Sequence, residues 1–552
     1  MLLRHEWLGL IGTDRASVSH HERTQATRNP HCSDSMFLGR NCQSDVAAYR
    51  ETSMISRERI LTKAAFGSRI AEDELDELQS YFVETEQWRK VLAGDVDIVF
   101  GAKGAGKSAL YSLLVAQKEQ LRLGRRTMFL AAENPRGTPA FRDLTTAPPL
   151  SEEHFRGLWK IYFLSISANY IRHHLDTTRT TNNDATAVID FLAKNGLLAP
   201  NVTLLTRLKA AVDYLRKWIP ALEGGITDPN TGLILSGKIT LAEPTPEQRG
   251  QGYESLDDLL TKLNGAYRQL NITTWLVLDR LDVAFSDSEQ LEGNALRSLF
   301  RTYLDMLALS NIKVKIFLRD DIWRKVVAGG FREASHVTRT LTLAWDHQSL
   351  LNLLVRRLAA NKLICDHFGV SEEEVLANAS LQSSFFYNIF PAQVDIGLSK
   401  PKTLDWMLSR SADGTKRTAP RELIHLLLAA RDEQLRLYQL GNSGPPEELL
   451  FDKAALRSAL PAVSKARYEQ TLCAEHPTLK PYLEKLEREK TQQSKESLSK
   501  LWKVGAEKAG EVAEKLVEAG FFERRGTKEN PNYWVPFLYR EALDMVQGTA
   551  TA

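Results

Sequence analysis

The stretch DIVFGAKGAGKSAL, residues 97–110, constrains the fold of this chain more than any other segment. It contains the pattern G-x-x-x-x-G-K-[ST], with a short apolar run before it and a helical pattern after it. Glycine permits backbone angles that turn successive N–H groups inward, and the start of a helix adds a partial positive charge. The stretch therefore predicts a phosphate-binding loop between a buried strand and a helix, rather than an ordinary glycine turn.

Two side chains of this loop are expected to meet the nucleotide directly. Lys107 can reach the β- and γ-phosphates, and the Ser108 hydroxyl can ligate Mg²⁺. The expected cofactors are therefore a nucleotide and Mg²⁺. The residues expected to bind the nucleotide are Gly101, Ala102, Lys103, Gly104, Ala105, Gly106, Lys107, Ser108 and Ala109.

A second magnesium ligand is expected at the end of another buried strand. In TWLVLDRLD an apolar run precedes Asp279, and a carboxylate in that position can hold the metal together with Ser108. The alternative is that Asp279 only caps a turn. Hydrolysis also needs a carboxylate that orients water, but Arg280 follows Asp279, where many P-loop ATPases have glutamate. Asp282 is the nearest candidate base and Glu133 a more distant one, so we expect slow hydrolysis.

Strand patterns alternate with helical patterns through the first part of the chain, which is typical of a parallel α/β sheet. Long helical patterns between residues 151 and 270 predict a helical insertion in this core. Residues 56–93 follow a helical pattern, as does most of the chain from about residue 346. The predicted strands are DVDIVFG, RRTMFLAAENP, TTWLVLD and KVKIFLR.

Four regions follow from these patterns. Residues 1–55 are polar and without period, and we expect a disordered or non-native tail. The other expected regions are a P-loop NTPase core at 56–345 with its insertion at about 151–270, a helical lid domain at 346–445, and a helical and winged-helix domain at 446–552.

Composition argues against several classes of protein. The net charge of +2 gives no general reason for binding to nucleic acid or membrane. The four cysteines lie far apart, which indicates a reducing compartment and argues against a zinc site or a disulfide framework. No apolar run approaches the roughly 18 residues that span a bilayer. We therefore expect a cytoplasmic protein without a membrane partner.

The order of the parts resembles AAA+ ATPases, and more closely their STAND and origin-recognition-like branches, over residues 60–545. GAKGAGKS resembles a Walker A motif and LVLDRLD a Walker B motif. The resemblance implies an ASCE/AAA+-like core with an all-α lid. It further implies that KIFLRDDIW is a sensor-1 strand with Arg319 and Asp320 beside the γ-phosphate.

The same resemblance implies that the Pro-Arg of GTKRTAPRELIHLLLAARDE opens a lid helix, with Arg421 as the phosphate-sensing arginine. For Arg319 and Arg421 the alternative is a surface salt bridge. Arg297 and Arg301 lie where an arginine finger is found in related assemblies, although a helix-surface arginine is the commoner explanation. The catalytic set expected from motif and resemblance together is Lys107, Asp279, Asp282, Arg319 and Arg421.

The C-terminal end predicts a winged helix-turn-helix. FFERR and NYWVPF bracket the polar turn GTKENP and follow a helix that stops at Gly520. Residues 491–530 hold eight Lys or Arg and seven Asp or Glu, whereas a DNA-reading face needs a positive excess. The balance favours protein docking or an inter-domain role over DNA binding.

The sequence leaves three functions open. The first is a Mg²⁺-dependent ATP-hydrolysing switch that moves the lid and winged helix and acts on an effector protein or through homo-oligomer assembly. Chains that resemble this one commonly look like bacterial antiphage-defence ATPases. The alternatives are a DNA-loading ATPase of the origin or transposition kind, and a nucleotide-binding scaffold that does not hydrolyse.

Overall fold

The chain divides into two units, Met1–Met54 and Ile55–Ala552. The computed structural model describes part of the second unit: residues 56–70, 73–74, 77–116, 126–132, 151–198, 206, 210–211, 213, 239–240, 245–250, 254–281, 289–527 and 530–551. The predicted tail at 1–55 and both candidate bases, Glu133 and Asp282, lie outside the described residues.

A five-stranded parallel sheet forms the centre of the core, in the order β2-β5-β6-β1-β7. All four predicted strands are present, and the predicted fold class, a parallel α/β core, is confirmed. The fifth strand, β7, is short and largely exposed, so it lacks the apolar run that reveals the others. The strands are β1 (Ile98–Gly101), β2 (Arg126–Ala131), β5 (Ile272–Leu278), β6 (Ile312–Arg319) and β7 (Thr340–Thr342).

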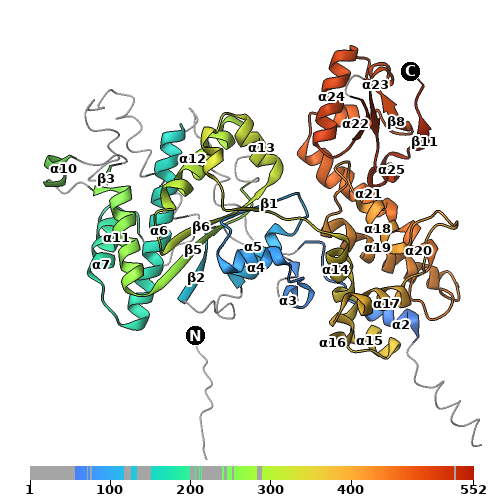
Figure 1. Cartoon of the computed structure of the whole chain (residues 1–552), viewed down its shortest axis with the longest axis horizontal. Helices are drawn as coiled ribbons and strands as arrows, with labels where there is room; N and C mark the ends of the chain where they lie inside the picture. The colour runs from blue at the N-terminus through green and yellow to red at the C-terminus, as the bar shows by residue number, and fades with distance from the viewer. Residues whose placement is uncertain are drawn as a thin grey trace, which may run out of the picture. The chain divides into compact units, whose positions relative to one another are not determined.

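Helices cover both faces of the sheet (Figure 1). Side chains alternate along each strand, so that Val314 and Ile316 of β6 pack into one layer and Phe317 into the other. One layer contains α4 (Glu86–Ala93) and α5 (Lys107–Ala116); the opposite layer contains α6 (Glu152–Thr178), α7 (Asn183–Lys194), α11 (Leu256–Gln269), α12 (Glu289–Met306) and α13 (Asp320–Ala328).

The longest helix of the insertion, α6, is buried on several sides. Its buried residues run almost without a break from Phe155 to Ala168. A helix that is apolar all round must be covered all round, and α6 packs against α7, α11 and α12. Short elements complete this region: α10 (Pro246–Gly250) and the parallel pair β3 (Ile239–Thr240) and β4 (Glu254–Ser255).

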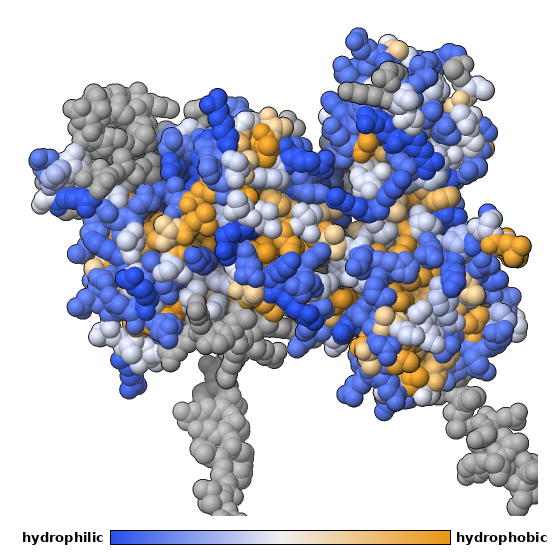
Figure 2. Space-filling view, in the orientation of Figure 1, coloured by the Kyte–Doolittle hydropathy of each residue, from blue (hydrophilic) through white to orange (hydrophobic). Residues whose placement is uncertain are grey.

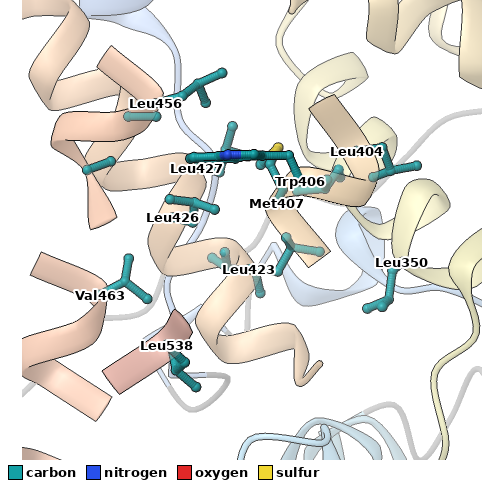
Figure 3. Packing of buried hydrophobic residues seen from close by; sticks show 14 of the residues in the cluster. Leu350, Leu404, Trp406, Met407, Leu423, Leu426, Leu427, Leu456, Val463 and Leu538 are labelled. Carbon is teal, nitrogen blue, oxygen red and sulfur yellow. The ribbon is translucent and has the colours of Figure 1, made fainter. Parts of the chain in front are cut away.

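A second hydrophobic core extends through the helices that follow β7 and continues into residues 463–543. We call residues 347–458 the helical lid, and the part of this core that lies among them the lid core. Apolar side chains from several of these helices point toward one another, with the Trp406 ring beside Leu427 and Met407 (Figure 3). The lid helices are α14 (His347–Ala359), α15 (Lys362–Phe368), α16 (Glu372–Leu376), α17 (Ala379–Ile389), α18 (Thr403–Ser411), α19 (Pro420–Gln439) and α20 (Lys453–Ser458).

The N-terminal segment joins the lid core and the sheet core. Ile60 and Leu61 of α2 (Arg57–Lys63) are buried in the lid core, whereas Trp88 of α4 packs on the sheet. The helical pattern expected over residues 56–93 is therefore divided into α2, α3 (Leu78–Tyr81) and α4. Local signals explain the division, because Ser56 caps α2 and Thr85 caps α4 with their side-chain oxygens.

The C-terminal module (residues 460–551) contains a four-stranded sheet in the order β11-β8-β10-β9. Strands β9 (Glu523–Gly526) and β10 (Pro531–Trp534) form an antiparallel pair where the two strands of a wing are expected. The other strands are β8 (Lys490–Ser494) and β11 (Val546–Thr549). The helices are α21 (Leu460–Arg467), the π-helix η3 (Tyr468–Cys473), α22 (Lys480–Glu484), α23 (Lys495–Trp502), α24 (Ala506–Glu518) and α25 (Phe537–Arg540).

The surface seen in Figure 2 is mostly hydrophilic, and hydrophobic residues form separate areas on it. Among the helices that the structure describes, none combines the length and the apolar character that a bilayer span requires.

Candidate nucleotide-binding site

The predicted site residues meet at the carboxyl edge of the sheet. The phosphate loop follows β1, Asp279 follows β5 and Arg319 ends β6, and β6 lies between the other two strands. Parallel strands bring their carboxyl ends to one edge, where α/β proteins bind ligands. A cleft of about 1470 Å³ opens there and is lined by the loop, by Asp279 and by residues of the lid and the C-terminal module.

The phosphate loop has the predicted backbone geometry. Gly104 and Gly106 have φ angles of +80° and +96°, a region that residues with a side chain seldom adopt. Lys107 begins α5, and its Nζ donates hydrogen bonds to the carbonyl oxygens of Gly101 (2.7 Å) and Ala102 (3.0 Å). The Nε1 of Trp345 donates to the carbonyl of Ala105 at 2.8 Å, which ties the loop to the segment after β7.

The two predicted magnesium ligands are in contact. The Ser108 hydroxyl donates to Oδ2 of Asp279 at 2.7 Å, although 171 positions separate the two residues in the sequence. Asp279 is only 3% exposed. Mg²⁺ prefers oxygen ligands and usually retains water and phosphate oxygens beside one or two protein groups. A hydroxyl and a carboxylate at the foot of a phosphate loop fit that ion.

The lid brings Arg421 to the phosphate loop, as the resemblance implies. Helix α19 begins at Pro420, where the resemblance implies a helix start, and proline is favoured in a first helical turn. A Cβ atom placed on Gly104 would lie 3.0 Å from Cβ of Arg421. The Nε of Arg421 donates to the carbonyl of Arg69 at 3.3 Å, so this side chain links the lid helix to the N-terminal segment.

Arg319 lines the same cleft, but two carboxylates hold its guanidinium. It bonds Asp321 through Nε and Nη2 at 3.0 and 2.7 Å, and Glu475 through Nη1 and Nη2 at 2.6 and 2.8 Å. Burial by itself would lower the pKa of Arg319, but the hydrogen bonds and charges of Glu475 and Asp321 raise it. Arg319 is therefore a permanent cation in this cleft.

The two candidate arginine fingers are engaged within their own chain. Arg297 Nε lies 2.6 Å from a carboxylate oxygen of Glu152. Arg301 contacts the other oxygen of Glu152 and also Glu333, the latter at 3.0 Å. These contacts join α12 to the start of α6 and agree with the structural alternative for both arginines.

Two walls of the cleft carry no motif in the sequence. Residues 68–70 and 81–83 line it from the N-terminal segment. That segment is fixed to α14 by a buried ion pair, in which Arg357 Nη2 lies 2.7 Å from Glu74 Oε1. Glu475 lines it from the C-terminal module and contacts Nζ of Lys103 at 2.6 Å. Such contacts join residues that are hundreds of positions apart in the sequence, so no local sequence pattern predicts them.

No protein-family model matches the chain, and a comparison with curated proteins found no match. Among solved structures, the ORC2 protein of Aeropyrum pernix in its ADPNP–ADP complexes is similar, with 12% identity and a TM-score of 0.37 over 88% of this chain and 96% of that one. Its ADP form gives 11% and 0.29, over 89% and 97%. Cdc6p from Pyrobaculum aerophilum gives 13% and 0.28, over 89% and 97%.

Proposed function

We propose that this protein is an AAA+-like, Mg²⁺-dependent ATPase that works as a molecular switch. The observation that carries the proposal is the 2.7 Å contact between Ser108 and buried Asp279, next to a loop whose glycines have the φ angles of a phosphate cradle. Two elements from opposite sides of β6 converge there, which a simple glycine turn does not require.

Each residue has a defined task in this proposal. The loop N–H groups and the N-terminus of α5 bind phosphate oxygens, and Lys107 neutralises part of their charge. Ser108 and Asp279 would hold Mg²⁺, which supplies charge neutralisation at the phosphates when it is bound. Arg421 belongs to the lid helix α19 and would contact the terminal phosphate. Loss of that phosphate would then remove a contact between the lid and the phosphate loop.

The base that orients water is proposed among the carboxylates near this edge. Asp282 remains the candidate from the sequence. Glu292 of α12 lines the same cleft and was not anticipated. Arg280, which follows Asp279 with a positive φ of 57°, stands where many related ATPases have glutamate, and we expect slow or partner-stimulated turnover.

We propose that the switch acts on a protein effector or through assembly of like subunits, in the manner of bacterial antiphage-defence ATPases. In the C-terminal module several basic side chains are paired with acidic ones: Lys508 with Glu511, Arg524 with Glu514 and Arg525 with Glu523. Basic residues that are already paired release fewer counterions from DNA. This supports protein docking over a DNA-loading role.

Calorimetry and phosphate release test the proposal. Wild type should bind ATP in the presence of Mg²⁺ and release phosphate. Lys107→Ala and Asp279→Asn should each lower kcat by about a hundredfold or more, because each removes charge stabilisation in the transition state. Lys194→Ala and Asp190→Asn, at exposed positions of α7, are matched controls and should behave as wild type.

The outcomes separate the alternatives. Tight ATP binding without phosphate release, alone or with a partner, identifies a non-hydrolysing scaffold. Binding of duplex DNA with a steep salt dependence identifies a DNA-loading enzyme. An absence of heat from ATP with Mg²⁺ contradicts the proposal altogether.

A further inference from the structure

Glu475 is an anion that the chain itself places in the phosphate cleft. It follows the π-helix η3 in the C-terminal module, and its carboxylate lies 2.6 Å from Nζ of Lys103 and 2.6 Å from Nη1 of Arg319. Lys103 belongs to the phosphate loop and Arg319 ends β6, so one side chain joins two parts of the candidate site. Its side chain is 18% exposed and that of Arg319 is 14% exposed, so solvent screens this pair only weakly.

Four charged side chains contact one another here, and their positive and negative charges are equal in number only when Glu475 is included. Lys103 and Arg319 are the cations, and Asp321 and Glu475 are the anions that contact them. Burial would raise the pKa of Glu475, but the hydrogen bonds and charges of Arg319 and Lys103 hold it below the usual glutamate value. The carboxylate is therefore ionised at neutral pH and occupies hydrogen-bond donors that suit phosphate oxygens equally well.

We propose that Glu475 occupies the cleft in place of the terminal phosphate, and that a nucleoside triphosphate, but not a diphosphate, displaces it from Lys103 and Arg319. This inference rests on the proposed nucleotide site. Glu475 and a terminal phosphate are both anions, so sharing the two cations makes them repel each other. A diphosphate lacks the terminal group that competes, so Glu475 makes the site sensitive to whether the nucleotide carries a γ-phosphate.

Displacement of Glu475 is coupled to the C-terminal module. Helix α21 leads through η3 to Glu475, and α21 packs against α25 and against the short helix η4 (Glu541–Leu543). π-helical turns are rare, and those that occur are often found at functional sites. Release of the Glu475 contacts removes an attachment between this module and the sheet core, so triphosphate binding loosens the module.

The test is calorimetric titration of the full chain with two probes, ADP and the non-hydrolysable triphosphate AMP-PNP, each with Mg²⁺. Glu475→Gln should tighten AMP-PNP binding by about tenfold, a typical coupling between sites, with a clearly smaller change for ADP. Glu484→Gln is the matched control, because Glu484 forms an exposed pair with Lys480 in the same module. It should leave both affinities unchanged.

Hydrogen exchange on wild type gives a second readout that needs no variant. Peptides covering residues 464–478 should exchange faster with AMP-PNP than with ADP, and Lys107→Ala should abolish the difference. Three results would overturn the inference and leave the nucleotide site intact. Glu475→Gln could raise the affinities for AMP-PNP and ADP equally, it could leave the affinity for AMP-PNP unchanged, or hydrogen exchange could be the same with both nucleotides. If neither wild type nor variant binds either probe, the nucleotide site itself is wrong.

Discussion

Two glycines of the phosphate loop share a backbone conformation but differ in what surrounds them. Both Gly104 and Gly106 have positive φ angles. A Cβ atom on Gly104 would lie 3.0 Å from Cβ of Arg421 in the lid, whereas on Gly106 the nearest atom would be Cζ2 of Trp345 at 3.8 Å. Only Gly104 is therefore needed for close approach of the lid helix.

This difference predicts unequal effects of two similar substitutions. Gly104→Ala and Gly106→Ala should each cost about 1–2 kcal/mol of stability, because alanine disfavours a left-handed backbone. Gly104→Ala should cost more, since its methyl group also pushes against α19, and it should weaken ATP binding more. Urea denaturation and calorimetry of both variants check this. Equal losses would show that the contact with Arg421 does not constrain the loop.

Motif residues at this site were predictable because their chemistry is local. Lys107 and Ser108 follow from a short pattern, and Asp279 follows from an apolar run that ends in a carboxylate. The resemblance gave the place of Arg421 beside the loop. Glu475 was not predictable, because its contact with Arg319 spans 156 positions and neither neighbourhood carries a signal. Ion pairs of this kind depend on the assembled fold.

Helix α19 links the lid core to the candidate nucleotide-binding site. Its first turn lies beside Gly104. Its buried residues, which include Leu423, Leu427 and Ala430, recur at helical spacing and form one face of the helix. The packing of this face, seen in Figure 3, therefore sets the position of Arg421.

Truncating this face should destabilise the lid. Leu427 is fully buried, and Leu427→Ala should lower the free energy of unfolding by about 2–5 kcal/mol, through lost burial and the cavity left behind. Leu440→Ala, at a position 67% exposed just after the same helix, should stay within about 0.5 kcal/mol of wild type. Chemical denaturation followed by circular dichroism compares them. Similar losses in the two variants would contradict the packing of α19.

Elements with strong patterns were predicted and elements with weak ones were not. Strands β1 and β5 carry continuous apolar runs, because parallel strands are buried on both faces, whereas in β6 Lys313 and Lys315 precede such a run. Strand β7 has the sequence TLT and β8 has KTQQS, and neither contains an apolar run that would distinguish it from a loop. Both are held by pairing with strands that are distant in the sequence.

The described hydrophobic clusters are assembled from residue 60 onward, and the chain before residue 55 forms a separate unit. Helix α2 lies just beyond that boundary. Through Ile60 and Leu61 it belongs to the lid core, and the following residues place Glu74 against Arg357.

Two shortened chains test this division. A chain that begins at Met54 should keep the melting temperature and the ATP affinity of the full chain. A chain that begins at Leu78 should melt several degrees lower, because it loses the four buried side chains of Ile60, Leu61, Ala64 and Phe66 and leaves Arg357 without Glu74. Thermal melts and calorimetry compare the two. A large loss in the longer chain, or none in the shorter one, would contradict the assignment of α2 to the lid.

The route of the N-terminal segment has a mechanical consequence. Two segments connect the lid with the sheet core: the N-terminal segment, in which Val83 packs in the lid core and Leu78 and Trp88 pack on the sheet, and residues 343–346. A lid that is joined at two points can rotate about the line between them, whereas a single connection would allow rotation about several axes. Under the proposed function, a change at the phosphate loop would then move the lid about one axis.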